Sequence, residues 1–385
     1  MTGKNGMKTA TRIIQIGTKQ IGGGLPIMLQ SMTATKTTDV ERTAETCQRL
    51  ADAGAGIVRI AVDTAHDAEA LQSIRKRTTA NLSVDLQENY RLAEIVAPFV
   101  DKIRYNPGHL HHAEPKIPWQ KKVERIVQIV RHHDCALRIG VNCGSLDPAL
   151  GQTADGRQQT ADNGIALNSA LQHAEFIDSL GFDRFCVSIK SSDPKAVVFA
   201  NRQFAAKRPD VPIHLGLTEA GLPPMGIEKS RAALEPLLVE GIGDTLRVSL
   251  TVPNDRKAEE IEAGRLILQN AATGRVLTDW QPEGVNIISC PSCARVENER
   301  FVLLAEQVQE ATLSIKVPLT IAVMGCRVNG PGETDHADIG LWCGKNSVNL
   351  KCGSTLVGTF GYDEVIEKML GVAEQQHCAK PCITL

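Results

Sequence analysis

The hydrophobic pattern of the chain alternates between two periods from residue 25 onward. Short apolar runs of strand length are separated by stretches whose apolar residues recur three and four positions apart, the spacing of one helix face. Eight runs predict strands, at Leu25–Gln30, Gly56–Val62, Leu82–Gln87, Val100–Tyr105, Ala136–Val141, Arg184–Ile189, Pro212–Leu217 and Asp244–Leu250. Predicted helices include Asp39–Ala53, Ala65–Lys76, Pro118–His133, Gly164–Leu180, Ile227–Val239 and Arg256–Asn270. Eight strands each followed by a helix, in roughly 250 residues, predict a (β/α)8 TIM-type barrel. A doubly wound open sheet is the alternative fold.

A stretch containing Pro and Gly, Gln281–Gly284, marks the predicted boundary between two domains. We assign residues 1–280 to the barrel and residues 285–385 to a small α/β domain. In this second region the pattern predicts strands at Val285–Ile288, Leu319–Val323, Ala337–Trp342 and Ser347–Lys351, and helices at Asn298–Gln309 and Tyr362–Gln375.

Composition argues against several classes of protein. The 385 residues carry a net charge of −2, which argues against a general nucleic-acid binder. The polar first residues lack the apolar segment of a secretory signal, and no apolar run reaches the roughly 18 residues of a membrane span. Without an export signal, the 11 cysteines are expected to be reduced, which favours metal-binding or structural roles over disulfides. We therefore expect a cytoplasmic protein.

Polar and charged residues stand at the C-terminal ends of the predicted strands. In a barrel these ends converge on one mouth, where active sites form. Five of the residues are cations on five different strands. Each alone could be a strand-end ion pair, but together they predict an anion site, because guanidinium groups bind phosphate oxygens through paired hydrogen bonds. The predicted mouth residues are Gln30, Ser31, Arg59, Asp85, Gln87, Arg104, Asn106, Arg138, Asn142, Lys190, Thr218, Glu219, Arg247 and Ser249.

Three cysteines in the second domain form the main candidate for a metal centre. Cys290 and Cys293 are three positions apart, and Cys326 follows in a predicted loop rich in Gly, Asn and Pro. Thiolates in this pattern suit an iron–sulfur cluster or zinc. A dithiol redox pair and merely buried thiols are the other interpretations. A structural zinc would need a further ligand, for which the candidates are Cys343, Cys352, Cys378 and Cys382.

Histidines cluster in the segment 109–117, which is predicted to be a loop. His109, His111 and His112 could bind a metal, but a solvated loop is the simpler interpretation.

Several motifs together resemble those of the 4-hydroxy-3-methylbut-2-enyl diphosphate synthases, iron–sulfur enzymes of the methylerythritol phosphate route to isoprenoids. The resemblance covers essentially the whole chain and is to the short bacterial form. That family combines a (β/α)8 barrel with a small cluster-bearing α/β domain. The motifs are Gln30–Thr33, Ile57–Ile60, Lys102–Gly108, Arg138–Asn142, Gly243–Ser249, Ser289–Cys293 and Met324–Glu333.

The resemblance implies a [4Fe–4S] cluster held by Cys290, Cys293 and Cys326, with the carboxylate of Glu333 as the fourth ligand. A carboxylate is a weaker partner for a soft cluster than a thiolate, so one iron would remain open to substrate. The implied reaction is the reductive ring opening and dehydroxylation of 2-C-methyl-D-erythritol 2,4-cyclodiphosphate, with electrons from a flavodoxin or ferredoxin. Glu219 is the implied proton donor. The implied substrate contacts are Arg59, Asp85, Arg104, Asn106, Arg138, Asn142, Lys190, Thr218, Arg247 and Ser249.

The chain departs from the family pattern in the third strand motif. Gln87 stands where a His is expected and Glu88 where an aromatic residue is expected, so one substrate contact differs. Cys378 and Cys382 lie outside the family motifs.

Assembly and two other functions complete the expectations. We expect a homodimer in which the second domain of one chain caps the barrel mouth of the other, because the linker begins at the opposite rim. The alternative functions are a non-catalytic iron–sulfur electron carrier or sensor, and a barrel enzyme with a structural zinc domain.

Overall fold

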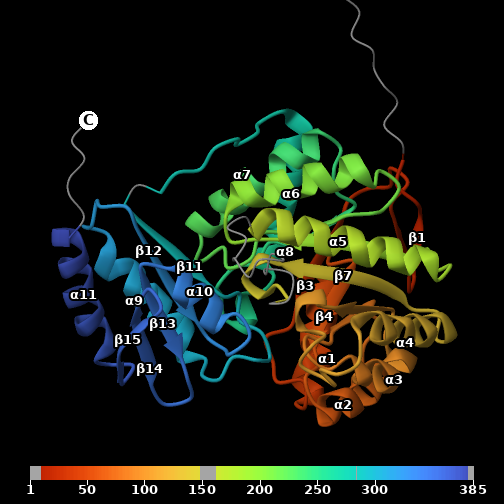
Figure 1. The fold of residues 1–385 in the computed structure, drawn as a ribbon, viewed down its shortest axis with the longest axis horizontal. Helices are drawn as coiled ribbons and strands as arrows, with labels where there is room; N and C mark the ends of the chain where they lie inside the picture. The colour runs from red at the N-terminus through yellow and green to blue at the C-terminus, as the bar shows by residue number, and fades with distance from the viewer. Residues whose placement is uncertain (1–9, 148–161, 283, 380–385) are drawn as a thin grey trace, which may run out of the picture.

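The computed structural model describes residues 10–147, 162–282 and 284–379, which form a barrel and a smaller domain beside it (Figure 1). Eight parallel strands form the barrel sheet in the order β8-β7-β6-β5-β4-β3-β10-β9. A parallel bridge between Val187 of β8 and Ile213 beside β9 links the two ends of this order. The predicted (β/α)8 barrel is therefore confirmed. No helix in the described ranges is long and apolar enough to cross a membrane.

The barrel elements follow the predicted alternation. Its strands are β3 (Met28–Met32), β4 (Ile57–Ala61), β5 (Leu82–Asp85), β6 (Lys102–Tyr105), β7 (Ala136–Asn142), β8 (Phe185–Lys190), β9 (His214–Leu215) and β10 (Thr245–Leu246). Its helices are α1 (Val40–Asp52), α2 (Ala65–Arg75), α3 (Ala93–Val96), α4 (Trp119–His132), α5 (Asp162–Ser179), α6 (Pro194–Lys207), α7 (Met225–Val239) and α8 (Glu259–Thr273). The last two strands are shorter than predicted, but each overlaps its predicted run.

A hairpin that the pattern did not predict lies at the N-terminal end of the barrel. Strands β1 (Ile14–Ile16) and β2 (Lys19–Ile21) pair antiparallel. The hairpin buries Ile14, Ile16 and Ile21 against Ile57, Ala136 and Cys186, which lie at or near the first residues of barrel strands. Strands of three residues are too short to show a hydrophobic period, so sequence analysis missed this hairpin.

The second domain contains one five-stranded sheet in the order β11-β12-β13-β14-β15. Its first three strands are parallel to one another, β14 is antiparallel to β13, and β15 is antiparallel to β14. The predicted Gly-Pro-Gly loop is instead the first turn of α10, where Pro331 is tolerated because that position needs no N–H donor. The elements are β11 (Val285–Ser289), α9 (Arg300–Thr312), β12 (Leu319–Met324), α10 (Gly330–His336), β13 (Ile339–Cys343), β14 (Val348–Cys352), β15 (Thr355–Phe360, not predicted) and α11 (Val365–Ala379).

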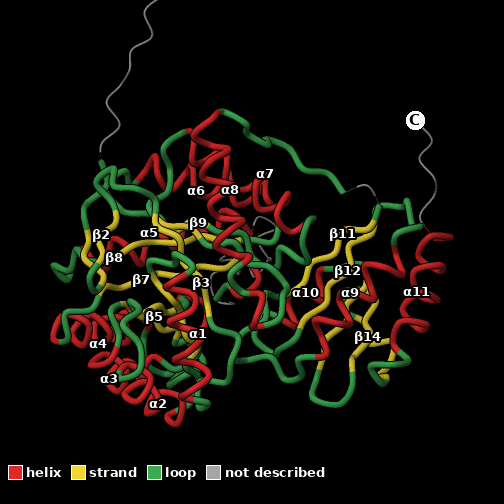
Figure 2. Tube along the Cα trace, turned by 180° about the vertical axis from the view of Figure 1, so that it is seen from behind, coloured by secondary structure: helices red, strands yellow, loops and turns green. Residues whose placement is uncertain are grey.

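The second domain covers the mouth of the chain's own barrel (Figures 1 and 2). The expectation that the linker prevents this arrangement is wrong. From the end of α8 the linker follows the outer helices, where Asp279 pairs with Lys195 at 3.2 Å and the Leu277 amide donates to Glu235 at 2.8 Å. The linker must return along the length of the barrel, which is about the length of a 15-residue helix such as α8, roughly 22 Å. Ten extended residues can span about 33 Å, so the linker is long enough to reach the mouth. The homodimer itself stays a prediction.

Candidate active site

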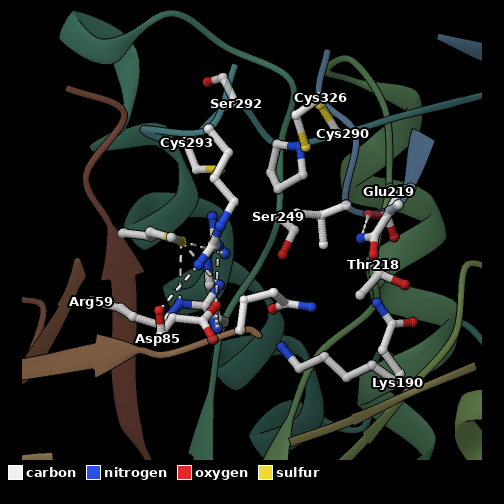
Figure 3. A pocket seen from close by; sticks show the side chains of 18 of the residues that line it. Arg59, Asp85, Lys190, Thr218, Glu219, Ser249, Cys290, Ser292, Cys293 and Cys326 are labelled. Carbon is white, nitrogen blue, oxygen red and sulfur yellow. Dashed lines mark hydrogen bonds and ion pairs between the residues drawn. The ribbon is translucent and has the colours of Figure 1, made fainter. Parts of the chain in front are cut away.

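A cavity lies between the barrel mouth and the second domain, and Figure 3 shows it from close by. We call its barrel side the floor and its second-domain side the roof. The roof carries Cys290, Cys293, Cys326 and Asn329. The floor holds every barrel residue that the family resemblance implied for the site except Asn106: Arg59, Asp85, Arg104, Arg138, Asn142, Lys190, Thr218, Glu219, Arg247 and Ser249. Gln30 and Ser31, which were also predicted at the mouth, do not line the cavity: Gln30 accepts from Lys102 at 3.0 Å and Ser31 donates to Glu260 at 3.0 Å. Residues predicted from strand ends and from a cysteine motif therefore line one space.

Two floor cations form ion pairs inside the protein. Arg104 donates to Asp85 and to the Gly140 carbonyl, both at 2.6 Å, and a Cβ at Gly140 would meet the Arg104 Nε at 2.0 Å, so only glycine fits there. Arg247 donates to the buried Glu260 at 3.2 Å. Burial opposes ionisation of Asp85, but neighbouring cations led by Arg104 hold its pKa well below the ordinary value. For these two arginines a structural ion pair is present.

Arg138 and Lys190 lack such a partner. In the described ranges, Arg138 Nε and NH1 are buried without a hydrogen-bond partner, and neither Arg138 nor Lys190 forms an ion pair. Burial, followed by the nearby arginines, lowers the pKa of Lys190 well below its ordinary value, and burial lowers that of Arg138 to about 10. Arg59 adds a third cation, which contacts the Met32 sulfur at 3.0 Å and lies 3.9 Å from Asp85. A bound anion would relieve this excess of buried positive charge.

Glu219 is the buried acid at the edge of the floor. Its backbone φ is +49°, a conformation that is uncommon for a residue other than glycine and often found at functional sites. Asn329 of the roof donates to one carboxylate oxygen at 2.8 Å, and the other oxygen is buried without a partner among the described residues. Burial raises the carboxyl pKa, although the hydrogen bond from Asn329 and nearby cations oppose that shift. The group is therefore placed to hold a proton nearer neutral pH than an ordinary Glu.

The three roof cysteines lie close enough to affect one another. Burial, then Cys326 and Cys293, raises the pKa of the Cys290 thiol well above its ordinary value. Burial and Cys293 raise that of Cys326 to about 12. The Gly325 amide donates to the Cys290 sulfur at 3.3 Å. Three thiols gathered in one buried site suit a cationic metal centre, which would favour the thiolate forms. The donor set therefore fits the implied cluster.

Two other predicted site residues do not line the cavity. Asn106 donates to Ser145 at 2.9 Å and accepts from the Gly108 amide at 3.1 Å, so its side chain holds the loop after β6 and does not face substrate. Glu333 is buried in α10 and accepts from Ser192 at 3.2 Å. Burial, then the charge of Glu219, raises the Glu333 pKa to about 8. Its role as the fourth cluster ligand stays a prediction.

Cys343 and Cys352, which were candidates for a further zinc ligand, do not line the cavity. Cys343 lies in the apolar core of the second domain, where burial raises its thiol pKa to about 12. Cys352 is half-buried at the end of β14. The Cys378 side chain and all of Cys382 lie outside the described residues.

Sequence analysis missed a contact between floor and roof. Arg295 donates to Asp63 at 2.7 Å and lies 3.4 Å from Asp85, which ties the roof to two barrel strands. Burial lowers its pKa, but the two carboxylates outweigh this and raise it well above the ordinary value. Arg295 stands two positions after the Ser289–Cys293 motif and Asn329 stands inside the Met324–Glu333 motif, and this position in the sequence was the available signal.

Gln87 and Glu88, the departures from the family pattern, take part in contacts at the same edge. Gln87 lines the cavity and accepts from Arg104 at 2.6 Å, and Glu88 pairs with Arg327 of the roof loop at 3.1 Å.

Comparison with known proteins matches both domains to one family. Residues 11–265 match the GcpE TIM-barrel domain and residues 286–375 match the GcpE protein C-terminal domain. The 4-hydroxy-3-methylbut-2-en-1-yl diphosphate synthase (flavodoxin) of Rhodopirellula baltica is 56% identical over 94% of this chain and 95% of its own length. The enzyme of the same name from Nitratiruptor sp. is 40% identical over 96% of this chain and 98% of its own. The chain therefore belongs to the GcpE family of 4-hydroxy-3-methylbut-2-en-1-yl diphosphate synthases.

Proposed function

We propose that the chain is an iron–sulfur oxidoreductase that opens the ring of 2-C-methyl-D-erythritol 2,4-cyclodiphosphate and removes a hydroxyl group, which yields (E)-4-hydroxy-3-methylbut-2-enyl diphosphate. The names of the GcpE relatives support this activity. The observation that carries it here is one cavity with buried, unpaired cations on its floor and three thiols on its roof. A non-catalytic electron carrier would have no use for such a floor, and a structural zinc site would have no use for a substrate cavity.

Cys290, Cys293 and Cys326 would hold the [4Fe–4S] cluster, which supplies the electrons for the reduction when it is bound. Glu333 is the proposed fourth ligand. Its carboxyl pKa of about 8 in the metal-free protein means that cluster binding must displace a proton, as metal binding to a protonated ligand does. Ser192 would then give up its hydrogen bond to this carboxylate.

The floor would bind the cyclic diphosphate through Arg138, Lys190 and Arg59. Each guanidinium can donate two parallel hydrogen bonds to phosphate oxygens. Arg138 Nε and NH1, which lie on different edges of the guanidinium and have no partner among the described residues, can each donate to a phosphate oxygen. Because these side chains stand on barrel strands, they are held in position before substrate arrives, which lowers the entropy cost of binding.

Glu219 would deliver the proton to the departing hydroxyl group. It lines the cavity with one oxygen that has no partner among the described residues, and burial raises its pKa, which favours the protonated form that can donate. Asn329 holds the other oxygen, which fixes the direction of that donation.

Electrons would enter beside Cys293. The side chains of Cys290 and Cys326 are 7% and 8% exposed, but Cys293 is half-buried and lines an outer groove as well as the cavity. Arg42 and Arg49 of α1 form one wall of that groove, and Phe301 and Val302 at the start of α9 form another. A flavodoxin or ferredoxin seated there would have a short path to the cluster. A homodimer remains part of the proposal.

An anaerobic turnover assay with the cyclic diphosphate and reduced flavodoxin tests the proposed function. Brown, iron-loaded protein that forms the linear diphosphate is the expected result. A colourless zinc protein, or an iron-loaded protein that leaves the cyclic substrate unchanged, would contradict it.

A further inference from the structure

Three metal-ligating side chains meet at the rim of the barrel beside the cavity. The ligand atoms of Glu88, His109 and His112 all lie within 4.8 Å of one another. Glu88 follows β5, and the histidines lie in and just after the short helix that follows β6. Because β5 and β6 are neighbouring parallel strands, the loops at their carboxyl ends lie side by side. The expectation of a solvated histidine loop is wrong for His109, which is buried.

Two imidazoles and one carboxylate are a donor set that binds zinc and leaves a fourth position open. Zinc bonds of about 2.1 Å in tetrahedral geometry place donor atoms about 3.4 Å apart. The three side chains would therefore have to draw together by at most about 1.4 Å, the difference between 4.8 Å and 3.4 Å. His112 and Glu88 can make this adjustment, since His112 is exposed and Glu88 is partly exposed.

The surroundings of both histidines disfavour the protonated form, which cannot bind a metal. Burial, followed by the neighbouring His112 and Arg104, lowers the pKa of His109 to about 3. Burial and His111 also lower the pKa of His112. The ring of His111 stacks on His112 at 4.1 Å between centroids, and its Nδ1 is buried without a partner within the described residues. A neutral imidazole has one nitrogen lone pair for a metal. In His109 that lone pair, on Nδ1, accepts from the Gln87 amide, so zinc has to displace this hydrogen bond or bind Nε2 after the proton moves to Nδ1.

We propose that Glu88, His109 and His112 form a zinc site at the rim of the barrel, open to solvent on the His112 side. The site is distinct from the three cysteines, and the proposal does not depend on the proposed reaction.

The Gln87 side chain determines which ring nitrogen of His109 carries the proton. Arg104 donates to the Gln87 oxygen at 2.6 Å, so the amide nitrogen faces His109 Nδ1 at 3.1 Å. In this arrangement Nδ1 accepts a hydrogen bond and Nε2 carries the proton. Zinc on Nε2 needs that proton on Nδ1 with an acceptor beside it. A Gln87→Glu side chain could accept from both Arg104 and Nδ1, so we expect it to strengthen zinc binding.

Glu88 also serves a second partner, Arg327, which approaches it at 3.1 Å. Arg327 directly follows Cys326 in the roof loop, so zinc and the roof compete for one carboxylate. Removing the arginine should therefore tighten zinc binding, whereas removing the carboxylate should weaken it. An increase in zinc affinity in one variant and a decrease in the other would distinguish a specific site from general attraction of cations to the surface.

Anaerobic calorimetric titration of the cluster-loaded protein with Zn²⁺ tests the proposal. We expect one zinc per chain. Glu88→Gln and His112→Asn should each weaken its binding by more than about tenfold, since even residues that only support ligands contribute that much. Arg327→Gln and Gln87→Glu should strengthen it. His132→Asn is the matched control, because His132 is an exposed histidine paired with His133 at the end of α4 and should leave binding unchanged.

X-ray absorption on the zinc-loaded protein gives an independent readout. A first shell of nitrogen and oxygen, without sulfur, supports the rim site. Zinc–sulfur distances near about 2.3 Å would mean that the metal sits on the thiols, and this result would overturn the proposal. Equal zinc affinity in wild type, Glu88→Gln and His112→Asn would overturn it as well, as would the absence of bound zinc.

Discussion

The floor and the roof of the cavity are built in opposite ways. Floor side chains such as Arg104 and Arg247 stand on barrel strands and pair with carboxylates of the same domain. The roof thiols stand on loops after β11 and β12, and after burial the neighbouring Cys293 raises the pKa of both Cys290 and Cys326. Arg104 and Arg247 of the floor are thus held by carboxylates of the barrel, whereas the roof gathers three thiols that suit a metal centre. Damage to the roof should remove the cofactor, and damage to the floor should change binding or rate while the cofactor stays.

The largest effect is expected from Cys326→Ser in the roof. Loss of one of three thiolates should release the cluster and abolish turnover, while the barrel keeps its fold because its core does not include the roof. Iron analysis and circular dichroism measure the two outcomes. Cys352→Ser, at a cysteine outside the cavity lining, serves as the control and should keep its iron. Wild-type iron content in Cys326→Ser would refute the ligand assignment.

Glu219→Gln should act on rate alone. The amide keeps the shape of the side chain but cannot supply a proton, and general acid catalysis contributes about 10²–10⁴-fold. We expect normal iron content, nearly normal substrate affinity and turnover reduced by that range. Single-turnover rates of iron-matched samples test this, with the helix-surface variant Glu228→Gln as the control. If Glu219→Gln retained more than about a tenth of wild-type turnover, the proton-donor role would fail.

Arg138→Gln should raise KM because it removes an unpaired floor cation. A charged hydrogen bond is worth about 1.5–3 kcal/mol, which corresponds to about tenfold or more in binding. The melting temperature should not fall, since Arg138 has no ion-pair partner among the described residues. Arg247→Gln is the informative contrast, because it removes one of the two cations that pair with the buried Glu260 and should lower the melting temperature as well. An unchanged KM in Arg138→Gln would make this arginine structural.

The smallest effect concerns Glu333 in metal-free protein. Its pKa is about 8 when folded and about 4.5 ordinarily, so the unfolded chain releases this proton first as pH rises. The stabilisation is complete below about pH 4.5 and is lost progressively up to about pH 8. Thermal melts should therefore show a stability that declines across this window. Glu333→Gln should flatten that decline, and an unaltered pH profile would argue against a buried protonated carboxyl.

Much of this arrangement follows from local sequence, and the misses have local causes. Polar residues at the C-terminal ends of the predicted strands identified the floor, because those ends of parallel strands meet at one mouth of a barrel. The cysteine motif identified the roof. The β1–β2 hairpin was missed because three-residue strands have no measurable period. Asn106 was assigned to substrate because position along a strand does not show that Ser145 and Gly108 already occupy its side chain. The path of the linker, and with it the position of the second domain, depends on contacts such as Lys195 with Asp279 that no motif encodes.

The central claim is that floor and roof act together on one bound diphosphate. Its most direct test is product analysis after anaerobic incubation of the iron-loaded chain with the cyclic diphosphate and reduced flavodoxin, beside the Cys326→Ser and Arg138→Gln variants. The account predicts the linear diphosphate from the wild-type chain, none from Cys326→Ser, and recovery of product from Arg138→Gln at high substrate concentration. A wild-type chain with a full, reduced cluster and unchanged cyclic diphosphate would contradict it.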